Sequence, residues 1–289
     1  MKTRPYKQVD VFAPAPYRAP YRGNPLAVVL DGADLDPVTM QHFARWMNLS
    51  ETVFLSPPTD PAADYRLRIF TPGSELPFAG HPTLGACHAW LESGGRPKTP
   101  GRVVQQCALG RVNLRIDGPV PAFEAPPLQR SAPDSALLAQ IARALGIAAA
   151  QIRAAQRLDN GPVWLGLLLD DARTVRALTP DHQALKALGQ MVGVAAVPTA
   201  SAAAQTPPAD LCVRAFTAPT GIDEDPVTGS LNASLAQWLI ADGLMPPRYI
   251  AAQGQSVGRD GRVHVLRDDD GRVWIGGASI TCIDGQVRL

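Results

Sequence analysis

Residues 76–91, LPFAGHPTLGACHAWL, form the stretch that decides the fold. The pattern predicts a tight loop leading directly into a helix, with Pro82 at the first helical position and His81 at the cap. The helix has almost no polar face, so we expect protein to enclose it on every side. Gly85 in its first turns costs roughly 0.5–1 kcal/mol relative to alanine, which indicates a closely packed neighbour.

The start of this helix has a chemical consequence. The first backbone N–H groups of a helix have no partner within it, and the helix dipole places positive potential at that end. A buried helix that opens at a glycine–histidine loop therefore predicts a binding site for an anionic group.

Composition restricts the possible classes of protein. The 289 residues are 46% hydrophobic, enough for the core of one large or two medium domains. The net charge of +1 and the scattered basic residues argue against nucleic acid as a partner. No apolar run approaches the ~18 residues of a membrane span, and the first residues lack the apolar core of a signal peptide. We expect a cytoplasmic protein that does not bind membranes.

The cysteines predict no metal site and no cofactor. They form no C-x-x-C pair, and the histidines are not spaced as zinc ligands with them. No Gly-x-Gly-x-x-Gly dinucleotide motif follows an expected strand. We expect small buried side chains in a reducing compartment. The four cysteines are Cys87, Cys107, Cys212 and Cys282.

The order of segments recurs after a proline-rich passage at residues 119–133, which is the best candidate for a domain boundary. The second series ends in another enclosed helix at residues 223–240, with Pro226 near its start. An ordered series of similar segments indicates two copies of one strand-rich unit, each wrapping a central helix. The matched segments are 23–30 with 160–169, 36–46 with 179–188, 50–55 with 193–197, and 67–71 with 211–217.

The repeat predicts where a ligand would bind. Two such helices facing one another would bring two N-termini to a single cleft between the domains. Backbone amides could hold a small molecule with a carboxylate group there.

Glu51 is the first candidate for chemistry. It lies at the start of a strand between Ser50 and Thr52, whereas the second copy has Val194 and Ala195 in the corresponding place. A carboxylate in a partly dry cleft can remove a proton as a base and return it as an acid. A glutamate at a helix end or on the surface gives the same pattern, and the residues alone favour neither.

Asp225 and His81 occupy matching places before the two enclosed helices. Aspartate before proline at a helix start is a common cap worth about 1 kcal/mol, and the residues alone favour capping. His81 follows glycine at an anion-binding helix end, which favours a functional role. Glu75 and Glu224 are expected to serve solvation or loop hydrogen bonds. Further polar or small residues with strong structural alternatives are Asn24, Thr228, Gly229 and Ser230.

Several motifs together resemble the PhzF family of phenazine biosynthesis-like proteins, in order and over nearly the whole chain. The resemblance implies the diaminopimelate epimerase fold: an α+β protein of two pseudo-symmetric domains, each a curled, mostly antiparallel sheet around a central helix. The domains would be residues 1–125 and 126–289, with the last strand able to return to the first. The motifs are residues 22–29, 48–54, 70–72, 79–85 and 224–230.

The resemblance also implies a cofactor-independent isomerase acting as a homodimer. In that family the glutamate that matches Glu51 moves a proton between carbons of a small carboxylated substrate. The matches to His81 and Asp225 assist at the pocket, and Gly80 and Ser230 fall on further pocket positions.

Two departures bear on chemistry and specificity. Related epimerases and racemases place a cysteine at each helix entrance, where this chain has Ala79 and residues 224–225, so a two-thiol racemase is excluded. Residues 13–21 and 258–261 also differ from relatives, which affects substrate identity rather than fold. The alternatives are an epimerase or racemase that uses carboxylates, and a protein that binds a metabolite without turnover.

Overall fold

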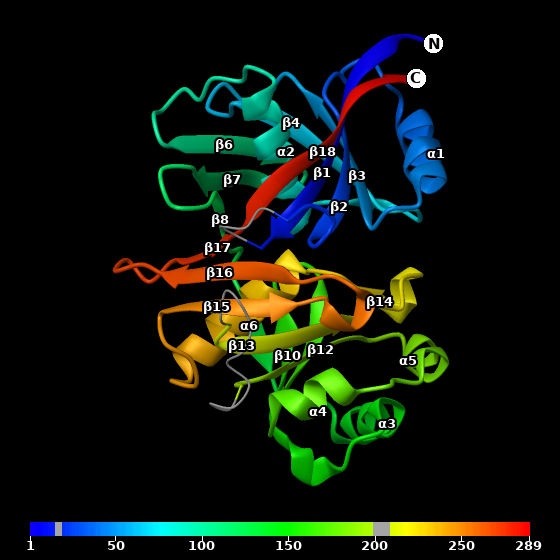
Figure 1. Cartoon of the computed structure of the whole chain (residues 1–289), viewed down its shortest axis with the longest axis vertical. Coiled ribbons are helices and arrows are strands. Elements are labelled where there is room, and N and C mark those ends of the chain that lie inside the picture. The colour runs from blue at the N-terminus through cyan, green and yellow to red at the C-terminus, as the bar shows by residue number, and fades with distance from the viewer. Residues whose placement is uncertain (15–18, 199–208) are drawn as a thin grey trace. The chain divides into compact units, whose positions relative to one another are not determined.

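The computed structural model describes residues 1–14, 19–198 and 209–289 (Figure 1). Part of the 13–21 segment that departs from relatives therefore lies outside the described residues. The chain divides into two compact units, Met1–Glu124 with Ile275–Leu289, and Ala125–Trp274.

The first unit wraps a sheet around helix α2. β1 pairs with β18 and β2 antiparallel, β2 with β3 parallel, and β3 with β4 antiparallel. β4 pairs antiparallel with the short β5 and parallel with β6. β6 pairs antiparallel with β7, and β7 pairs antiparallel with β8. The elements are β1 (Thr3–Ala13), β2 (Asn24–Val29), α1 (Pro37–Met47), β3 (Glu51–Ser56), β4 (Tyr65–Phe70), β5 (Glu75–Leu76), α2 (Gly80–Glu92), β6 (Arg102–Cys107), β7 (Gly110–Arg115), β8 (Ala122–Glu124) and β18 (Ala278–Arg288).

The second unit repeats this order of pairings. β10 pairs with β9 and β11 antiparallel, β11 with β12 parallel, and β12 with β13 antiparallel. β13 pairs antiparallel with the short β14 and parallel with β15, which is antiparallel to β16. The elements are β9 (Gln129–Ser131), α3 (Ser135–Leu145), β10 (Ile152–Asp159), β11 (Val163–Leu169), α4 (Ala172–Ala177), α5 (His182–Leu188), β12 (Met191–Ala196), β13 (Leu211–Phe216), β14 (Glu224–Asp225), α6 (Gly229–Ala241), β15 (Arg248–Gln253) and β16 (Gly261–Arg267). β17 (Val273–Gly276) spans the boundary between the two units.

The matching order of antiparallel and parallel pairs confirms the predicted α+β fold of two similar halves. Burial confirms the two predicted enclosed helices. In α2, all residues from Gly80 to Cys87 are buried, and α6 is buried over nearly its whole length. The helix starts predicted from proline were less accurate, as described below.

His81 is not the cap of α2, contrary to the prediction. The helix begins at Gly80 with Ala79 as its N-cap, and its first backbone bond joins the Thr83 N–H to the Ala79 carbonyl at 3.2 Å. Pro82 is therefore the third helical residue. Proline fits there equally well, because the first four N–H groups of a helix have no partner within it.

Asp225 is likewise not the cap of α6. It lies in β14, where it pairs with Ala215, and the helix begins only at Gly229 with Thr228 as its N-cap. The extended pairing of β14 continues through Asp225, so the chain needs the next residues to turn into the helix. The capping interpretation is therefore wrong, and the Asp225 side chain requires another explanation.

The two units contain a similar arginine–glutamate ion pair at corresponding positions. Arg68 and Glu75 form a two-bond ion pair at 2.7 and 2.7 Å, and Arg214 and Glu224 form one at 3.0 and 2.7 Å. Each arginine also lies over the phenylalanine two residues later, at 5.1 and 5.0 Å from the ring centre. These glutamates therefore join short strands to the sheet, rather than serving solvation or loop hydrogen bonds.

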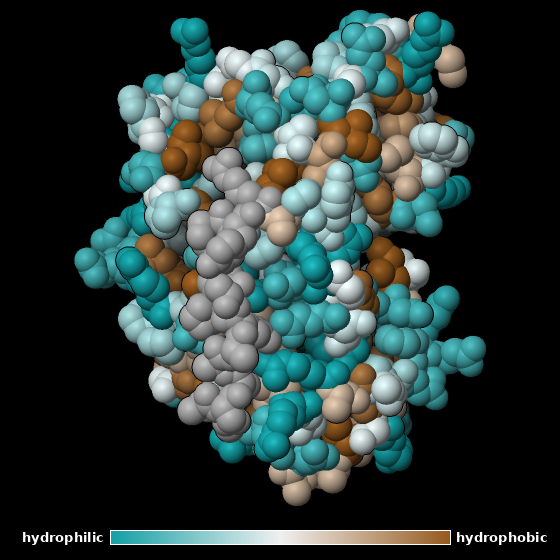
Figure 2. Space-filling model, viewed as in Figure 1, coloured by the Kyte–Doolittle hydropathy of each residue, from teal (hydrophilic) through white to brown (hydrophobic). Residues whose placement is uncertain are grey.

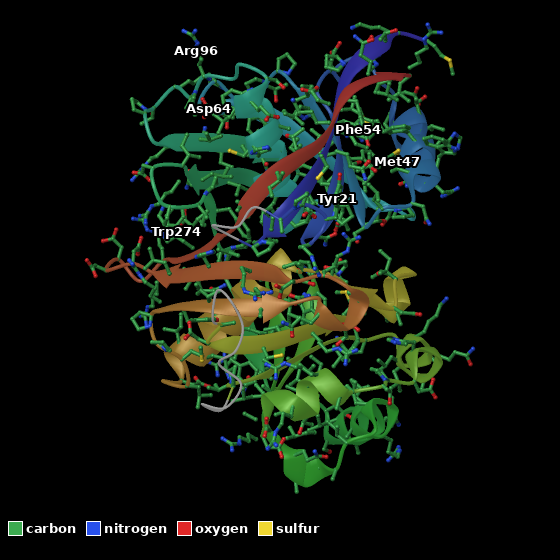
Figure 3. All side chains as sticks on the ribbon, viewed as in Figure 1. Tyr21, Met47, Phe54, Asp64, Arg96 and Trp274 are labelled. Carbon is green, nitrogen blue, oxygen red and sulfur yellow. The ribbon has the colours of Figure 1, made fainter. Side chains whose placement is uncertain are left out.

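Apolar side chains of α1 cover one part of the first sheet. Met40, Phe43 and Ala44 of the helix form a cluster with Phe54 of β3, and Met47 packs against it (Figure 3). The outer surface is mostly hydrophilic, with apolar residues scattered over the visible face (Figure 2).

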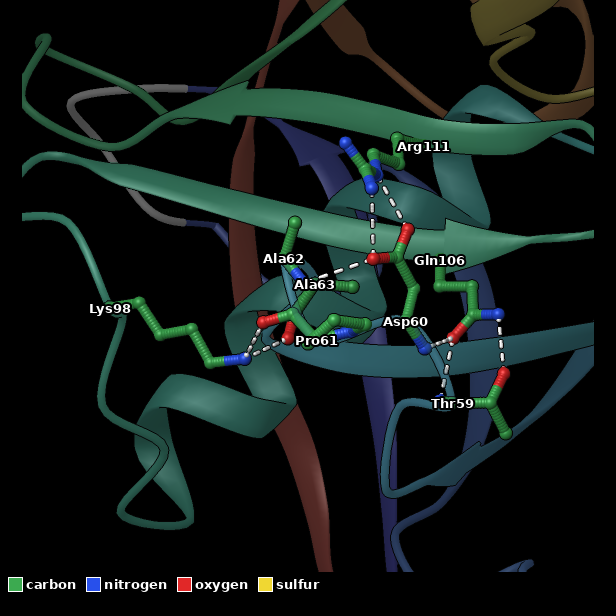
Figure 4. Close-up of polar contacts among 8 residues, drawn as sticks. All are labelled: Thr59, Asp60, Pro61, Ala62, Ala63, Lys98, Gln106 and Arg111. Atoms are coloured by element: carbon green, nitrogen blue, oxygen red, sulfur yellow. Dashed lines mark hydrogen bonds and ion pairs between the residues drawn. The ribbon is translucent and has the colours of Figure 1, made fainter.

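The turn between β3 and β4, residues 57–63, is held by the strands beside it (Figure 4). Arg111 of β7 donates to the Asp60 carboxylate at 2.9 Å, and Gln106 Oε1 accepts from the Asp60 N–H at 3.1 Å. Lys98 donates to two carbonyls of the turn at 2.7 and 2.6 Å. These contacts fix the exit of the strand that Glu51 begins.

Gly85 has the close neighbours that its sequence position indicated, and a substitution tests them. A Cβ at this position would lie 2.5 Å from Leu26 Cδ2 and 2.8 Å from Val11 Cγ2. We expect Gly85→Ala to destabilise the protein by about 1–3 kcal/mol through overpacking, although alanine is the better helix former. Thermal unfolding measures the loss. Gly285→Ala, where nothing lies within 4 Å, is the control and should change little; equal effects would contradict the packing account.

Candidate active site

Glu51 and His81 lie together in the first unit. His81 Nδ1 is 3.1 Å from Glu51 Oε2, and the two side chains are 4% and 16% exposed. Among the described residues, the buried Glu51 Oε2 accepts no hydrogen bond of good geometry. A carboxylate oxygen near an imidazole, with little water and no fixed hydrogen bond, is suited to taking up and releasing a proton.

Neighbouring elements of the sheet place these residues and Asn24. In the parallel pair of β2 and β3, Leu26 lies opposite Glu51, and the fully buried Asn24 begins β2. The bare backbone of Gly85 lets α2 approach Leu26, which brings His81 to the same end of the sheet.

Asp10 fixes the loop before Asn24. Its carboxylate is 3% exposed and accepts from the N–H groups of Arg22 at 2.9 Å and Gly23 at 3.0 Å. A Cβ at Gly23 would lie 2.0 Å from the Val11 carbonyl oxygen, so the approach requires glycine. Asp10 is not among the residues predicted from the sequence, although an acid within an otherwise apolar strand was a signal for it.

A buried chain of hydrogen bonds holds the first turn of α2. Tyr65 donates to Gln105 Oε1 at 3.1 Å, and Gln105 Nε2 donates to Thr83 Oγ1 at 3.0 Å. Thr83 Oγ1 donates to the Ala79 carbonyl at 2.9 Å. The chain ends on a backbone carbonyl and so has a structural role.

In the second unit, Asp225 and Thr228 lie together. Thr228 Oγ1 donates to Asp225 Oδ2 at 2.6 Å. Gly229 and Ser230 are the first two residues of α6. Trp164 donates to Ser230 Oγ at 3.3 Å, and Asn160 donates to its carbonyl at 3.0 Å, so this turn is also firmly held.

The N-termini of the two central helices differ from those of the other helices. An aspartate side chain caps each of α1, α3, α4 and α5, whereas Ala79 of α2 and Thr228 of α6 make no side-chain cap bond. Uncapped N–H groups at a buried helix start favour an anionic ligand. This supports the anion site predicted from the sequence. The capping aspartates are Asp36, Asp134, Asp171 and Asp181.

The strand registers correct the predicted counterpart of Glu51. Leu26 lies opposite Glu51 in the first unit, and Trp164 lies opposite Met191 in the second. The counterpart is therefore Met191, and Val194 and Ala195 lie further along the strand. The asymmetry remains, since a carboxylate in one unit corresponds to a thioether in the other.

His81 and Asp225 do not occupy matching places either. His81 is the second residue of α2, as Ser230 is of α6. Asp225 lies opposite Ala215 as Leu76 lies opposite Ile69, so its counterpart is Leu76. The catalytic candidates of the two units are thus unrelated by the repeat.

Burial opposes thiolate chemistry. It raises the pKa of the Cys87 thiol to about 12 and is the largest cause of the raised pKa at Cys107, Cys212 and Cys282. Such groups remain protonated thiols at neutral pH and react slowly.

Thiol alkylation tests this expectation. We expect iodoacetamide at pH 8 to leave the activity of the folded protein unchanged, with modification beginning at Cys282, which alone of the four is only partly buried. Mass spectrometry locates the label while turnover is followed. Rapid inactivation with a label on Cys87 would restore thiol catalysis as an alternative.

The described residues contain no group of three or more histidine, cysteine or acidic residues that could hold a metal ion, and no helix among them is long and apolar enough to span a membrane. Two hollows in the second unit are lined by residues between Leu145 and Thr179 and by residues that include Arg214 and Glu224.

Residues 254–258, GQSVG, match the Gly-x-Ser-x-Gly letters of a hydrolase elbow, a match that the sequence analysis overlooked. That motif requires a strand followed directly by an α-helix. Here a single 3₁₀ turn, Gln255–Val257, leads to another strand, and Ser256 is exposed. The structural context therefore does not support a nucleophile elbow.

Comparison with known proteins gives one consistent result. Residues 9–285 match the family model of PhzC-PhzF, phenazine biosynthesis-like protein. Antisense-enhancing sequence 1 of Schizosaccharomyces pombe is 33% identical over 99% of both chains. Trans-2,3-dihydro-3-hydroxyanthranilate isomerase of Pseudomonas chlororaphis is 31% identical over 98% of this chain and 99% of its own. A PhzF family structure from Enterococcus faecalis, 27% identical, covers 100% of both chains with a TM-score of 0.79.

Proposed function

Because the chain belongs to the phenazine biosynthesis-like PhzC-PhzF family, we propose that it is an isomerase that moves a proton between carbon atoms of a small carboxylated metabolite. The observation that carries this proposal is the contact between the partly exposed Glu51 and the buried His81, 3.1 Å apart. Curated relatives over nearly the whole chain are named as isomerases, which supports the reaction class.

In the proposed reaction Glu51 acts first as a base and then as an acid. Its carboxylate removes a proton from an activated carbon, the electrons of the broken C–H bond shift an adjacent double bond, and the carboxylic acid returns the proton to another carbon. The step balances without a cofactor. His81 orients the Glu51 carboxylate through the 3.1 Å contact between its Nδ1 and Glu51 Oε2.

The uncapped starts of α2 and α6 are the proposed sites for anionic groups of the substrate, with Gly80 and Gly229 allowing close approach of backbone amides. Asp225 is proposed to accept a hydrogen bond from a hydroxyl or amino group of the substrate, and Asn24, Thr228 and Ser230 are proposed as further substrate-binding residues. We further propose that the protein works in the cytoplasm as a homodimer.

A first assay uses the substrate named for the Pseudomonas relative, trans-2,3-dihydro-3-hydroxyanthranilate, followed by proton NMR. A wider set of cyclic amino and hydroxy acids is screened by thermal shift, because a bound ligand stabilises the folded state. We expect a product in which a double bond lies at a different position from that in the substrate. A product that differs only by an inverted stereocentre would indicate an epimerase, and saturable binding without any product would indicate a binding protein.

A further inference from the structure

A buried amide connects the start of α6 to strand β15. Gln253, the last residue of β15, is 1% exposed and makes hydrogen bonds with both ends of its side-chain amide. Its Oε1 accepts from the Thr228 N–H at 3.1 Å and from Asn232 Nδ2 at 2.8 Å. Its Nε2 donates to the Asp225 carbonyl at 3.1 Å and to Thr228 Oγ1 at 2.9 Å.

Backbone groups determine the orientation of this amide. The Thr228 N–H can only donate, and the Asp225 carbonyl can only accept, so the oxygen and nitrogen of Gln253 cannot be exchanged. The direction of every other bond in the network follows from this. Thr228 Oγ1 receives a proton from Gln253, so its own single proton points to Asp225 Oδ2 at 2.6 Å.

The backbone also packs closely at this point. A Cβ on Gly254 would lie 2.6 Å from the Pro226 carbonyl oxygen, and Gly254 has a positive φ of +99°. The end of β15 is therefore pressed against the segment between Asp225 and the helix, which keeps Gln253 in place.

We propose that Gln253 is a positioning residue, which orients the Thr228 hydroxyl and so holds Asp225 as an ionised hydrogen-bond acceptor in the pocket. This inference rests on the proposed function, in which Asp225 contacts the substrate. A carboxylate that receives a hydrogen bond from an oriented hydroxyl is stabilised in its charged form.

The first unit offers a matched comparison. Gln105 is 0% exposed, lies on the corresponding strand β6, and also donates to a threonine hydroxyl in a central helix. That threonine, Thr83, donates to a backbone carbonyl, which does not titrate and contacts no proposed substrate group. Making the same substitution at both glutamines thus distinguishes the general effect of replacing a buried amide from the specific effect on the Asp225 carboxyl.

The test is Gln253→Glu, with Gln105→Glu as the control. An ionised glutamate side chain can only accept where Gln253 Nε2 donates, so it would turn the Thr228 hydroxyl away from Asp225 and add a negative charge nearby. Carbon-13 NMR of aspartate-labelled protein, with the Asp225 signal assigned from Asp225→Asn, follows the titration of this carboxyl without any substrate. We expect the Asp225 midpoint to move upward by about one unit or more in Gln253→Glu, and not to move in Gln105→Glu.

Kinetics provide the second measurement. A hydrogen bond to a charged group is worth about 1.5–3 kcal/mol, so kcat/KM should fall roughly 10–100-fold in Gln253→Glu, mainly through KM. Thr228→Val removes the same hydrogen bond without a new charge and serves if Gln253→Glu does not fold. An unmoved Asp225 midpoint in both site variants would overturn the inference. Glu51→Gln is measured alongside to distinguish the proposed function from the role of Gln253. Full activity of Glu51→Gln would overturn the proposed function, whereas the Asp225 midpoint tests the role of Gln253.

Discussion

Replacing Glu51 with glutamine is expected to lower kcat by about 10²–10⁴-fold, the usual contribution of a positioned acid–base group. Glutamine keeps the size and one acceptor oxygen of the side chain but cannot take up a proton under these conditions. Because Glu51 lies at the start of β3 and is still 16% exposed, the substitution should leave the fold intact. Initial rates at saturating substrate measure the effect.

Glu75→Gln is the matched control for this experiment. Glu75 also begins a short strand of the first unit, but it pairs with Arg68 near the surface. Its replacement should leave kcat unchanged and affect stability only slightly. Equal rates for Glu51→Gln and the wild-type protein would remove Glu51 from the reaction.

The second large effect concerns stability. We expect Arg214→Met to destabilise the second unit by about 3–5 kcal/mol, the usual cost of leaving one partner of a buried ion pair unpaired. Arg214 and Glu224 are 7% and 4% exposed, and Arg214 also donates to the carbonyls of Val175 and Leu178 at 3.1 and 2.7 Å. Its removal leaves a buried carboxylate and two carbonyls without their donor.

The repeat supplies the control for this prediction as well. Arg68→Met breaks the corresponding pair in the first unit, where the arginine is 21% and the glutamate 37% exposed. Water can solvate the remaining glutamate, so the loss should be about 1 kcal/mol or less. Thermal unfolding compares the variants, and the expected fall for Arg214→Met is roughly 6–20 °C at about 2–4 °C per kcal/mol. Similar decreases in melting temperature for both variants would show that burial does not determine how much stability is lost when the ion pair is broken.

Partial recovery in a double variant would support the same cause. Glu224→Leu added to Arg214→Met removes the orphaned charge and should restore part of the lost stability. A double variant less stable than Arg214→Met would instead indicate that the glutamate has favourable contacts of its own.

Local patterns in the sequence were sufficient for most of the fold. The two apolar helices follow from short-range signals, and the order of similar segments revealed the repeat. The glycine in α2 correctly indicated a close neighbour. The candidates Glu51 and His81 also prove to be in contact.

Errors arose where pairing between distant strands decides the boundary. Proline at positions 82 and 226 suggested helix starts, but α2 begins two residues before Pro82 and α6 begins three residues after Pro226. The two-residue strand β14 explains the second case, because its pairing with β13 is invisible in local sequence. The false match of His81 with Asp225 followed from the same cause.

Supporting polar residues were missed for a related reason. Asp10, Gln105 and Gln253 lie within strands, where a polar side chain gives no local sign of its partner. Their contacts reach across 13, 22 and 25 positions of the chain, so only the folded sheet shows them. Residue type identified the groups proposed for chemistry, and the structure identified those that hold them.

Solvent deuterium in the product tests the central claim, that Glu51 carries the proton between carbons, most directly. The reaction is run in D₂O with the wild-type protein and with Glu51→Gln, and proton NMR locates deuterium in the isolated product. We expect deuterium at the newly protonated carbon with the wild-type protein, except for the share of protons returned before exchange, and product formation about 10²–10⁴-fold slower with the variant. Product formed by Glu51→Gln at the wild-type rate, with deuterium at the same carbon, would contradict the account.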